Sequence, residues 1–270
     1  MEARAKAVGA PPLFYMYPQN GGVDAQQAQA LLDAGVDPAR ILPDLHVGAG
    51  GAVDEAAGLF NNPPVPGFTQ GAINAETNAG THDLQRALDE AADLIAWWTA
   101  DTKVSSRLYA RTASFCSGTS NNFDQWDQGI SFFLPNMTWI QPPGYVHTLM
   151  KATWAETVLA SSFAAGNGTF PFAAQRTADG KSLVLRAVNK LKGSQPFVVT
   201  LGGGASAAGP SYTLWLLGDG NRFLPTDDNP PGDPARISPQ SASVPLAAGA
   251  TSVSATLPPL SFAVMVIPLA

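Results

Sequence analysis

An acidic residue, Glu76, ends a short apolar run, 68–76, that reads as a β-strand. A polar turn over 77–80 follows it, and a long helical pattern comes next. In an α/β barrel, catalytic groups lie at the carboxyl ends of strands, where the strand holds the backbone and the side chain faces the pocket. A carboxylate placed there can attack the anomeric carbon of a sugar or stabilise a cationic transition state. The alternative is an exposed acid at a strand–loop junction, or an additional cap for the following helix.

Alternating strand and helix patterns surround Glu76. Thr81 is expected to be the N-cap of the helix after it, with Asp83 in the first turn. This helix is expected to continue to about Thr99, because apolar residues recur on one face at helical spacing. The other elements predicted in this part are helices at 23–35, 53–60 and 144–154, and strands at 39–47, 107–115 and 130–134. Strands that alternate with helices over 39–115 are typical of parallel βαβ units, and the last strand and helix extend the pattern.

Beyond about residue 156 the helical periodicity ends. Five β-rich runs follow, separated by Gly, Pro, Asn and Asp, which predicts an antiparallel β-sandwich. The runs are "SLVLRAVN", "PFVVTL", "YTLWLL", "TSVSATL" and "SFAVMVI". We therefore expect an α/β domain over 1–155 and an all-β domain over 156–270.

Composition excludes several classes of function. The net charge is −6 and no cluster of Lys or Arg stands out, which disfavours nucleic acid as a partner. No run of eighteen apolar residues is present, so no membrane span is expected. The one cysteine has no metal-ligand spacing, and neither a metal nor a cofactor is expected.

Two glycosylation sequons, at Asn136 and Asn167, are weak indicators of secretion, because such triplets also arise by chance.

Several segments, in order, resemble the later part of the α-L-arabinofuranosidases of glycoside hydrolase family 51. The resemblance covers about residues 40–270, and the shared order of the segments makes it fairly specific. The matching segments are "DLHVGAGGAVDEAAGLFNN" (44–62), "GAINAETNAGTHDLQRALDEAADL" (71–94), "ASFCS" and "WDQGISFF" (113–133), "PPGYVHTLMKATWAETVLASSF" (142–163), "TDDNPPGDPARISPQ" (226–240) and "LPPLSFAVMVI" (257–267).

The resemblance implies the later strands of a (β/α)8 TIM barrel followed by the β-sandwich. It implies a retaining hydrolase that releases terminal α-L-arabinofuranosyl groups from arabinose-containing polysaccharides or oligosaccharides, outside the cell or in the cell wall. Glu76 corresponds to the nucleophile and His46 to a pocket histidine, although His46 taken alone reads as structural. Asn78 and Trp126 could line the pocket, with surface or core roles as the alternative. His82 and His147 fall inside helical patterns and are expected to be structural.

The sequence departs from the family pattern in two respects. Thr77 and Ala75 flank Glu76, where the family has an aromatic residue after the nucleophile and a glycine before it. A retaining glycosidase also needs a second carboxyl group about 5 Å from the first, and the family supplies it from an Asn-Glu pair that this sequence lacks. Three or four strands cannot close an eight-stranded barrel. We therefore expect a truncated chain that lacks the acid/base.

Two other interpretations stay open at this stage. The chain could be a catalytically inactive relative that binds carbohydrate or another partner. It could also be a structural β-sandwich protein with a vestigial α/β part. The oligomeric state is not predicted.

Overall fold

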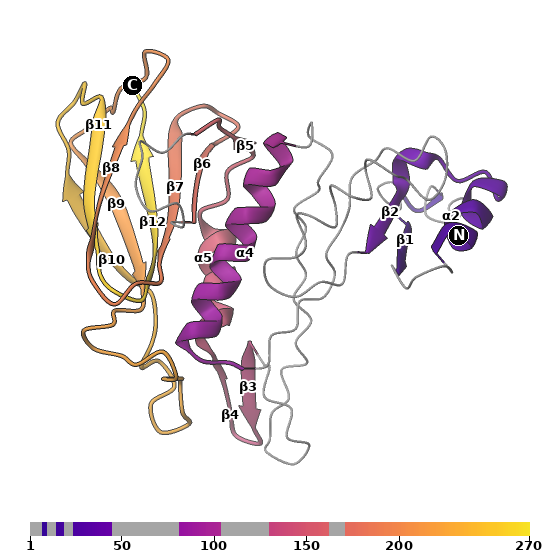
Figure 1. The fold of residues 1–270 in the computed structure, drawn as a ribbon, viewed down its shortest axis with the longest axis horizontal. Coiled ribbons are helices and arrows are strands. Elements are labelled where there is room, and N and C mark those ends of the chain that lie inside the picture. The colour runs from indigo at the N-terminus through magenta and orange to yellow at the C-terminus, as the bar shows by residue number, and fades with distance from the viewer. Residues whose placement is uncertain (1–6, 10–14, 19–23, 45–80, 104–129, 162–170) are drawn as a thin grey trace. The chain divides into compact units, whose positions relative to one another are not determined.

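The computed structural model describes residues 7–9, 15–18, 24–44, 81–103, 130–161 and 171–270 (Figure 1). The chain divides into two compact units, residues 1–78 with 100–115 and residues 79–99 with 116–270. Each unit is described by itself. The boundary predicted at residues 155–156 falls inside the second unit, and the division into domains stays a prediction.

The first unit contains a short βαβ arrangement. Strand β1 (Tyr15–Pro18) pairs in parallel with β2 (Ile41–Asp44), and helix α2 (Asp24–Asp33) and a 3-10 helix, η1 (Pro38–Arg40), connect them. Ala28 of α2 and Ile41 of β2 are fully buried and form a small core with the apolar side chains around them. The helix predicted at 23–35 is confirmed. The strand predicted at 39–47 is confirmed over residues 41–44, while residues 39 and 40 belong to η1 and residues 45–47 lie outside the described part of the chain. β1 is an additional strand that the sequence patterns did not indicate.

Most of the second unit is antiparallel β-structure. Strands β5 to β7, β9, β10 and β12 form a six-stranded sheet in the order β10-β9-β12-β7-β6-β5, and β8 pairs with β11. The bounds are β5 (Thr157–Val158), β6 (Phe172–Arg176), β7 (Ser182–Asn189), β8 (Gln195–Thr200), β9 (Ser211–Leu217), β10 (Gln240–Pro245), β11 (Ser252–Leu257) and β12 (Ser261–Pro268). All five β-rich runs predicted from the sequence are strands.

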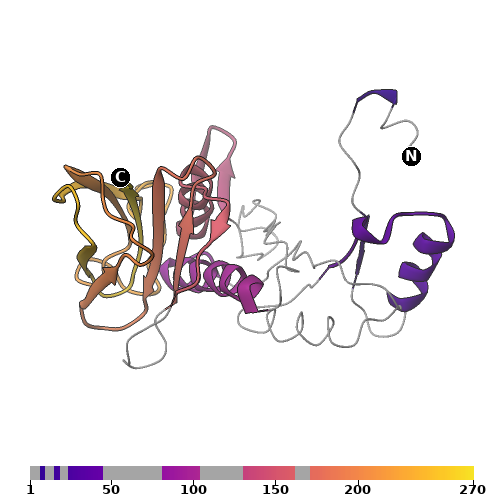
Figure 2. The ribbon, with the colours of Figure 1, turned by 90° about the horizontal axis from the view of Figure 1, so that it is seen from above.

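One hydrophobic core joins the six-stranded sheet to the β8–β11 pair. Leu185 of β7 and Met265 of β12 belong to it, as do Phe197 of β8 and Val253 of β11. Figures 1 and 2 show α4 (Leu84–Lys103) and α5 (Pro142–Ala152) beside the sheet, on the side away from β8 and β11. Every residue of β7 after Ser182 is buried. A strand that is covered on both faces needs apolar residues at successive positions, which explains why β7 reads as a nearly continuous apolar run.

Helix α4 presents the apolar face that the sequence predicts. Leu84, Ala87, Leu88 and Ala91 are fully buried, and Ile95 is nearly so. The helix extends to Lys103, four residues beyond the predicted end. Within the described residues, no helix is both long and apolar enough to cross a membrane.

The predicted strand at 130–134 is confirmed as β3 (Ser131–Leu134), but its expected role is wrong. It pairs antiparallel with β4 (Met137–Ile140) in a hairpin and does not continue a parallel sheet among the described strands. Two neighbouring prolines start α5 directly after this hairpin, where proline is favourable because its missing N–H has no partner in a first turn.

Gly144, in the first turn of α5, lies against the hairpin so closely that no side chain fits. A Cβ atom there would be 2.3 Å from the carbonyl oxygen of Ile130 and 2.7 Å from Cγ2 of Ile140. The Ile130 carbonyl also accepts a hydrogen bond from the Gln141 N–H at 3.0 Å, so it cannot move away without cost.

We expect Gly144→Ala to lower the free energy of unfolding by about 2–3 kcal/mol, because the added methyl group forces α5 and the hairpin apart. Urea denaturation followed by circular dichroism measures this. Gly232→Ala is the matched control, since no heavy atom lies within 4 Å of a Cβ at that position. Equal stability of the two variants would show that the contact at Gly144 is not restrictive.

Candidate functional site

The four predicted site residues, Glu76, His46, Asn78 and Trp126, lie outside the described residues. The structure describes the elements that flank them in sequence. β2 ends two residues before His46, α4 begins eight residues after Glu76, and β3 begins five residues after Trp126. The predicted site residues are therefore connected in the chain to elements that the structure describes.

The N-terminus of α4 is capped by Asp83. Its Oδ1 atom accepts a hydrogen bond from the Arg86 N–H at 2.9 Å, and the Thr81 hydroxyl donates to the same oxygen at 3.1 Å. The prediction of Thr81 as the N-cap is therefore wrong by two residues, and Asp83 precedes the helix. Both Thr and Asp can cap a helix, so residue type alone did not decide between them.

The loop between β9 and β10 holds the start of α4 through backbone hydrogen bonds. The Leu84 N–H donates to the Asp227 carbonyl at 2.9 Å, and the Gln85 N–H donates to the Pro225 carbonyl at 2.8 Å. These N–H groups have no partner within the helix itself. The segment that follows Glu76 and Asn78 in sequence therefore enters a helix whose first turn is bonded to this loop.

His82 contributes a side-chain contact to the same attachment. Its Nε2 atom lies 2.8 Å from Oδ2 of Asp228, and its ring lies 4.7 Å from the ring of Phe132 in β3. The prediction that His82 lies inside a helix is wrong, because α4 begins two residues later. A structural role for His82 fits these contacts.

Asn229, from the same loop, is fully buried and is a centre of hydrogen bonding that sequence reasoning missed. Its side chain donates to the carbonyls of Ile140 and Ile237 at 2.9 and 3.0 Å and accepts from the Ile237 N–H at 2.7 Å. Its backbone carbonyl accepts from Trp139 Nε1 at 2.6 Å and from Gln141 Nε2 at 2.9 Å, and its N–H donates to Gln141 Oε1 at 3.0 Å. The loop is thereby joined to the β4–α5 connection.

A buried ionic group joins α4 to α5. Glu90 Oε2 lies 2.5 Å from Arg86 Nη2 one turn earlier, and Glu90 Oε1 lies 3.2 Å from His147 Nε2 of α5. Arg86 and Glu90 are 4% and 2% exposed, so both charges are removed from water together. The prediction that His147 lies in a helix is confirmed. Glu90 acts here as an internal partner and is not presented to solvent.

Arg186 of β7 is a second buried charge, fully enclosed on the helix side of the sheet. Its guanidinium donates to the Gln175 side-chain oxygen and to the carbonyl and hydroxyl of Thr153, the hydroxyl at 3.1 Å. Burial lowers the pKa of Arg186 to about 9, so the group is still charged at neutral pH. Between pH of about 9 and the ordinary arginine value, the unfolded chain binds more protons, and the contribution of Arg186 to stability rises with pH across that window.

We expect Gln175→Leu to lower the free energy of unfolding by about 2–3 kcal/mol at pH 7, because a buried charge loses an acceptor. Adding Arg186→Met should recover part of the loss, since no buried charge is then left without its Gln175 acceptor, while the Thr153 carbonyl and hydroxyl lose their donor. Urea denaturation of the single and double variants measures the coupling. Gln195→Leu, at the start of β8, is the matched control and should change stability by about 0.5 kcal/mol or less. Additive effects in the double variant would contradict the pairing.

Among the residues that the structure describes, no group of three or more His, Cys, Asp and Glu side chains could hold a metal ion. The described residues therefore provide a framework of buried hydrogen bonds that flanks the predicted site in sequence.

No protein-family model matches the sequence, and neither does any curated protein. The fold is similar to solved structures of glycoside hydrolases, among them the catalytic domain of a family 30 xylanase C from Talaromyces cellulolyticus. That match has a TM-score of 0.53 and 16% sequence identity, and it covers 98% of this chain and 54% of that one.

Within this class, higher TM-scores are found with α-L-arabinofuranosidases of family 51. An arabinose-bound family 51 enzyme matches with a TM-score of 0.69 and 15% identity, over 99% of this chain and 42% of that chain. The arabinose complex of the Thermotoga maritima α-L-arabinofuranosidase matches with a TM-score of 0.69 and 14% identity, over 99% of this chain and 60% of that chain. The likeness confirms the resemblance to family 51 at the level of the fold. This chain spans 42–60% of the length of these two relatives.

Proposed function

We propose that this chain is the C-terminal part of a retaining α-L-arabinofuranosidase that releases terminal α-L-arabinofuranosyl groups from arabinose-containing polysaccharides or oligosaccharides. The observation that carries the proposal is the TM-score of 0.69 to an arabinose-bound family 51 enzyme over 99% of this chain. The activity belongs to the whole protein, outside the cell or in the cell wall, and this chain contributes its nucleophile.

The proposed architecture is a partial (β/α)8 barrel over 1–155 and a β-sandwich over 156–270. The parallel β1–α2–β2 arrangement supports the first, because parallel strands joined by a helix are the repeating unit of such barrels. The single core shared by the six-stranded sheet and the β8–β11 pair supports the second.

In the proposed mechanism the Glu76 carboxylate attacks the anomeric carbon of the arabinofuranosyl group and forms a covalent glycosyl-enzyme, which water then hydrolyses. His46, Asn78 and Trp126 bind the sugar. The departing oxygen must be protonated by a second carboxyl group about 5 Å away. We place this acid/base outside the present chain.

Two of the other glutamates are described, and both have structural partners. Glu90 is held between Arg86 and His147 inside the α4–α5 interface. Glu156 accepts a hydrogen bond from the Ala178 N–H at 2.7 Å, beside the turn that follows β6. These positions support an acid/base that comes from elsewhere.

The proposal is tested with an activated aryl α-L-arabinofuranoside, in which the leaving phenol has a low pKa. Such a leaving group departs without protonation, so the first step needs the nucleophile but not the missing acid. We expect the purified chain to release about one equivalent of phenol quickly and then to turn over slowly, because no base activates water. Absence of any release above the rate in buffer would contradict the proposal.

A second candidate function, carbohydrate binding without hydrolysis, is favoured by the structural roles of Glu90 and Glu156. It predicts that arabinose-containing oligosaccharides bind the chain in a calorimetric titration while the activated substrate releases no phenol. Release of phenol above the rate in buffer would exclude this candidate.

A further inference from the structure

The hairpin of β3 and β4 carries a sequon, Asn136-Met137-Thr138, at its turn. Leu134 pairs with Met137 across the hairpin, so Pro135 and Asn136 form a two-residue connection between the strands. A sequon with a residue other than proline in the middle is the acceptor motif for an N-linked glycan, and in secreted proteins it lies in surface loops.

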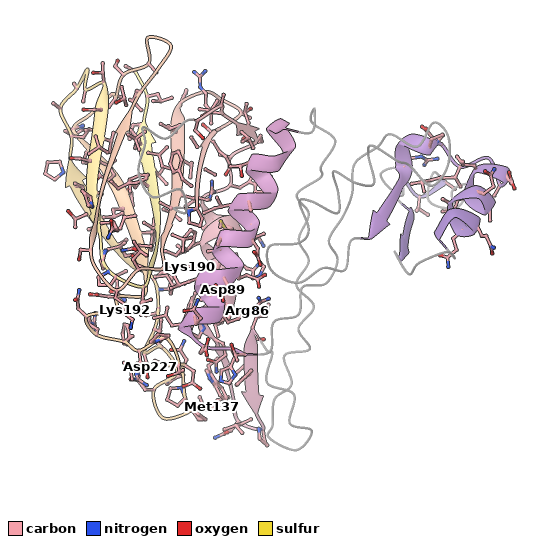
Figure 3. All side chains as sticks on the ribbon, in the orientation of Figure 1. Arg86, Asp89, Met137, Lys190, Lys192 and Asp227 are labelled. Carbon is pink, nitrogen blue, oxygen red and sulfur yellow. The ribbon has the colours of Figure 1, made fainter. Side chains whose placement is uncertain are left out.

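Side chains at the tip of this hairpin face solvent, while those nearer its base are buried. Asn136 and Thr138 are exposed, and Leu134 is 37% exposed. Phe132 and Trp139, which pair with each other across the hairpin, are each 7% exposed. Figure 3 labels Met137 at the outer end of the hairpin, away from the sheets and helices of this unit. A bulky substituent on Asn136 would therefore extend into solvent.

Asn136 differs in this respect from the other asparagines that the structure describes. Asn189 and Asn229 are fully buried and bonded to backbone groups. Asn221 is exposed but is followed by Arg and Phe, which form no sequon. Among the described asparagines, Asn136 alone combines the motif with an exposed position.

We propose that Asn136 is a site of N-linked glycosylation. In the transfer, the Asn136 Nδ2 atom forms a bond to C1 of the first sugar of a lipid-linked oligosaccharide. The bond from that C1 to the diphosphate oxygen of the lipid breaks, the lipid diphosphate leaves, and an Nδ2 proton is released to a base. The glycan would cover the hairpin tip, where Leu134 and the neighbouring turn are exposed, and would leave the buried Phe132 and Trp139 undisturbed.

The test is to direct the full chain into the endoplasmic reticulum of a eukaryotic host with a heterologous signal peptide. The secreted protein is treated with peptide N-glycosidase in heavy-oxygen water and mapped by mass spectrometry. We expect residue 136 to be recovered as aspartate that carries the heavy oxygen. An unmodified Asn136 in secreted, folded protein would overturn the proposal.

Variants separate the effect of the motif from an effect on folding. Asn136→Gln and Thr138→Ala should remove the glycan at this position completely, whereas Thr138→Ser should retain it because the hydroxyl is kept. Asn167→Gln removes the second sequon and should leave the modification at Asn136 unchanged. Equal urea denaturation midpoints for the variants would show that each is folded. Loss of the glycan in Thr138→Ser, or its retention in Thr138→Ala, would also overturn the proposal. The outcome is independent of any hydrolase activity.

Discussion

Glu76→Gln is expected to reduce the release of phenol from an activated aryl α-L-arabinofuranoside by about 10⁴-fold or more, since the amide removes the proposed nucleophile. The activated substrate is needed because the acid/base lies outside the chain in our proposal. Initial rates of phenol release, with substrate in excess, measure the effect. A decrease of less than about tenfold, equivalent to about 1.4 kcal/mol in the barrier, would contradict a role for Glu76 as nucleophile.

Two comparisons distinguish loss of the nucleophile from a general disturbance. Glu156→Gln makes the same chemical change at an exposed position in the second unit, and we expect it to leave the rate unchanged. Azide added to Glu76→Gly should restore part of the rate, because the small anion can occupy the space that the removed side chain leaves. The sugar azide formed in that way should have the inverted anomeric configuration, since one displacement replaces two.

Asn229→Leu is expected to have the largest effect on stability, a loss of about 4 kcal/mol in the free energy of unfolding. Leucine has a similar volume but leaves the Ile237 N–H and the carbonyls of Ile140 and Ile237 without their Asn229 partner. A buried polar group without a partner costs about 1–3 kcal/mol. The substitution also weakens the attachment of the 225–237 loop, which bonds to the first turn of α4. Urea denaturation of the whole chain measures the loss.

Asn221→Ala is the matched control for this prediction. Its side chain is exposed and donates to Asp219 Oδ1 at 2.9 Å. We expect a change of about 0.5 kcal/mol or less, as is usual for surface substitutions. If Asn229→Leu were as stable as Asn221→Ala, the hydrogen bonds of Asn229 would not hold the loop. Hydrogen exchange at the Ile237 N–H, which donates to Asn229, gives a local readout of the same attachment.

The elements that the sequence predicted well have a strong local signal. The apolar face of α4 recurs at helical spacing, and the runs that became β7 and β12 are apolar at nearly every position because both faces of the sheet are covered. Gly, Pro and Asn residues separate the runs and place their ends within a residue or two.

Where prediction failed, the deciding interactions join distant parts of the chain. β1 is only four residues long and depends on its pairing with β2, 26 residues away in the register Tyr15↔Ile41. β3 became a hairpin strand because β4 follows after two residues, a pairing that the helix–strand alternation did not suggest. Asn229 precedes two prolines in a loop, and three of its partners, residues 139–141, are about ninety residues earlier in the chain. No local sequence pattern predicts a contact between residues so far apart in the chain.

The residues of the candidate site come from the sequence alone, and the structure describes elements that flank them in the chain. Glu76 was identified by its position at a predicted strand end, and the resemblance to family 51 gave it a role. The structure adds the attachment of α4, which begins eight residues later, to the loop at Asp227. Periodicity predicted the helix but could not predict that a loop between β9 and β10 would fix its first turn.

Capture of a pentosyl group on the chain tests the proposed function most directly. The protein is mixed with the activated aryl α-L-arabinofuranoside, quenched in acid within the first turnover, digested and mapped by mass spectrometry. We expect the peptide that contains Glu76 to gain the mass of one pentosyl residue on that side chain, and the Glu76→Gln peptide to remain unmodified. An intact, folded chain in which Glu76 stays unmodified while phenol is released, or in which the pentosyl group is found on another residue, would contradict the assignment of Glu76 as the nucleophile.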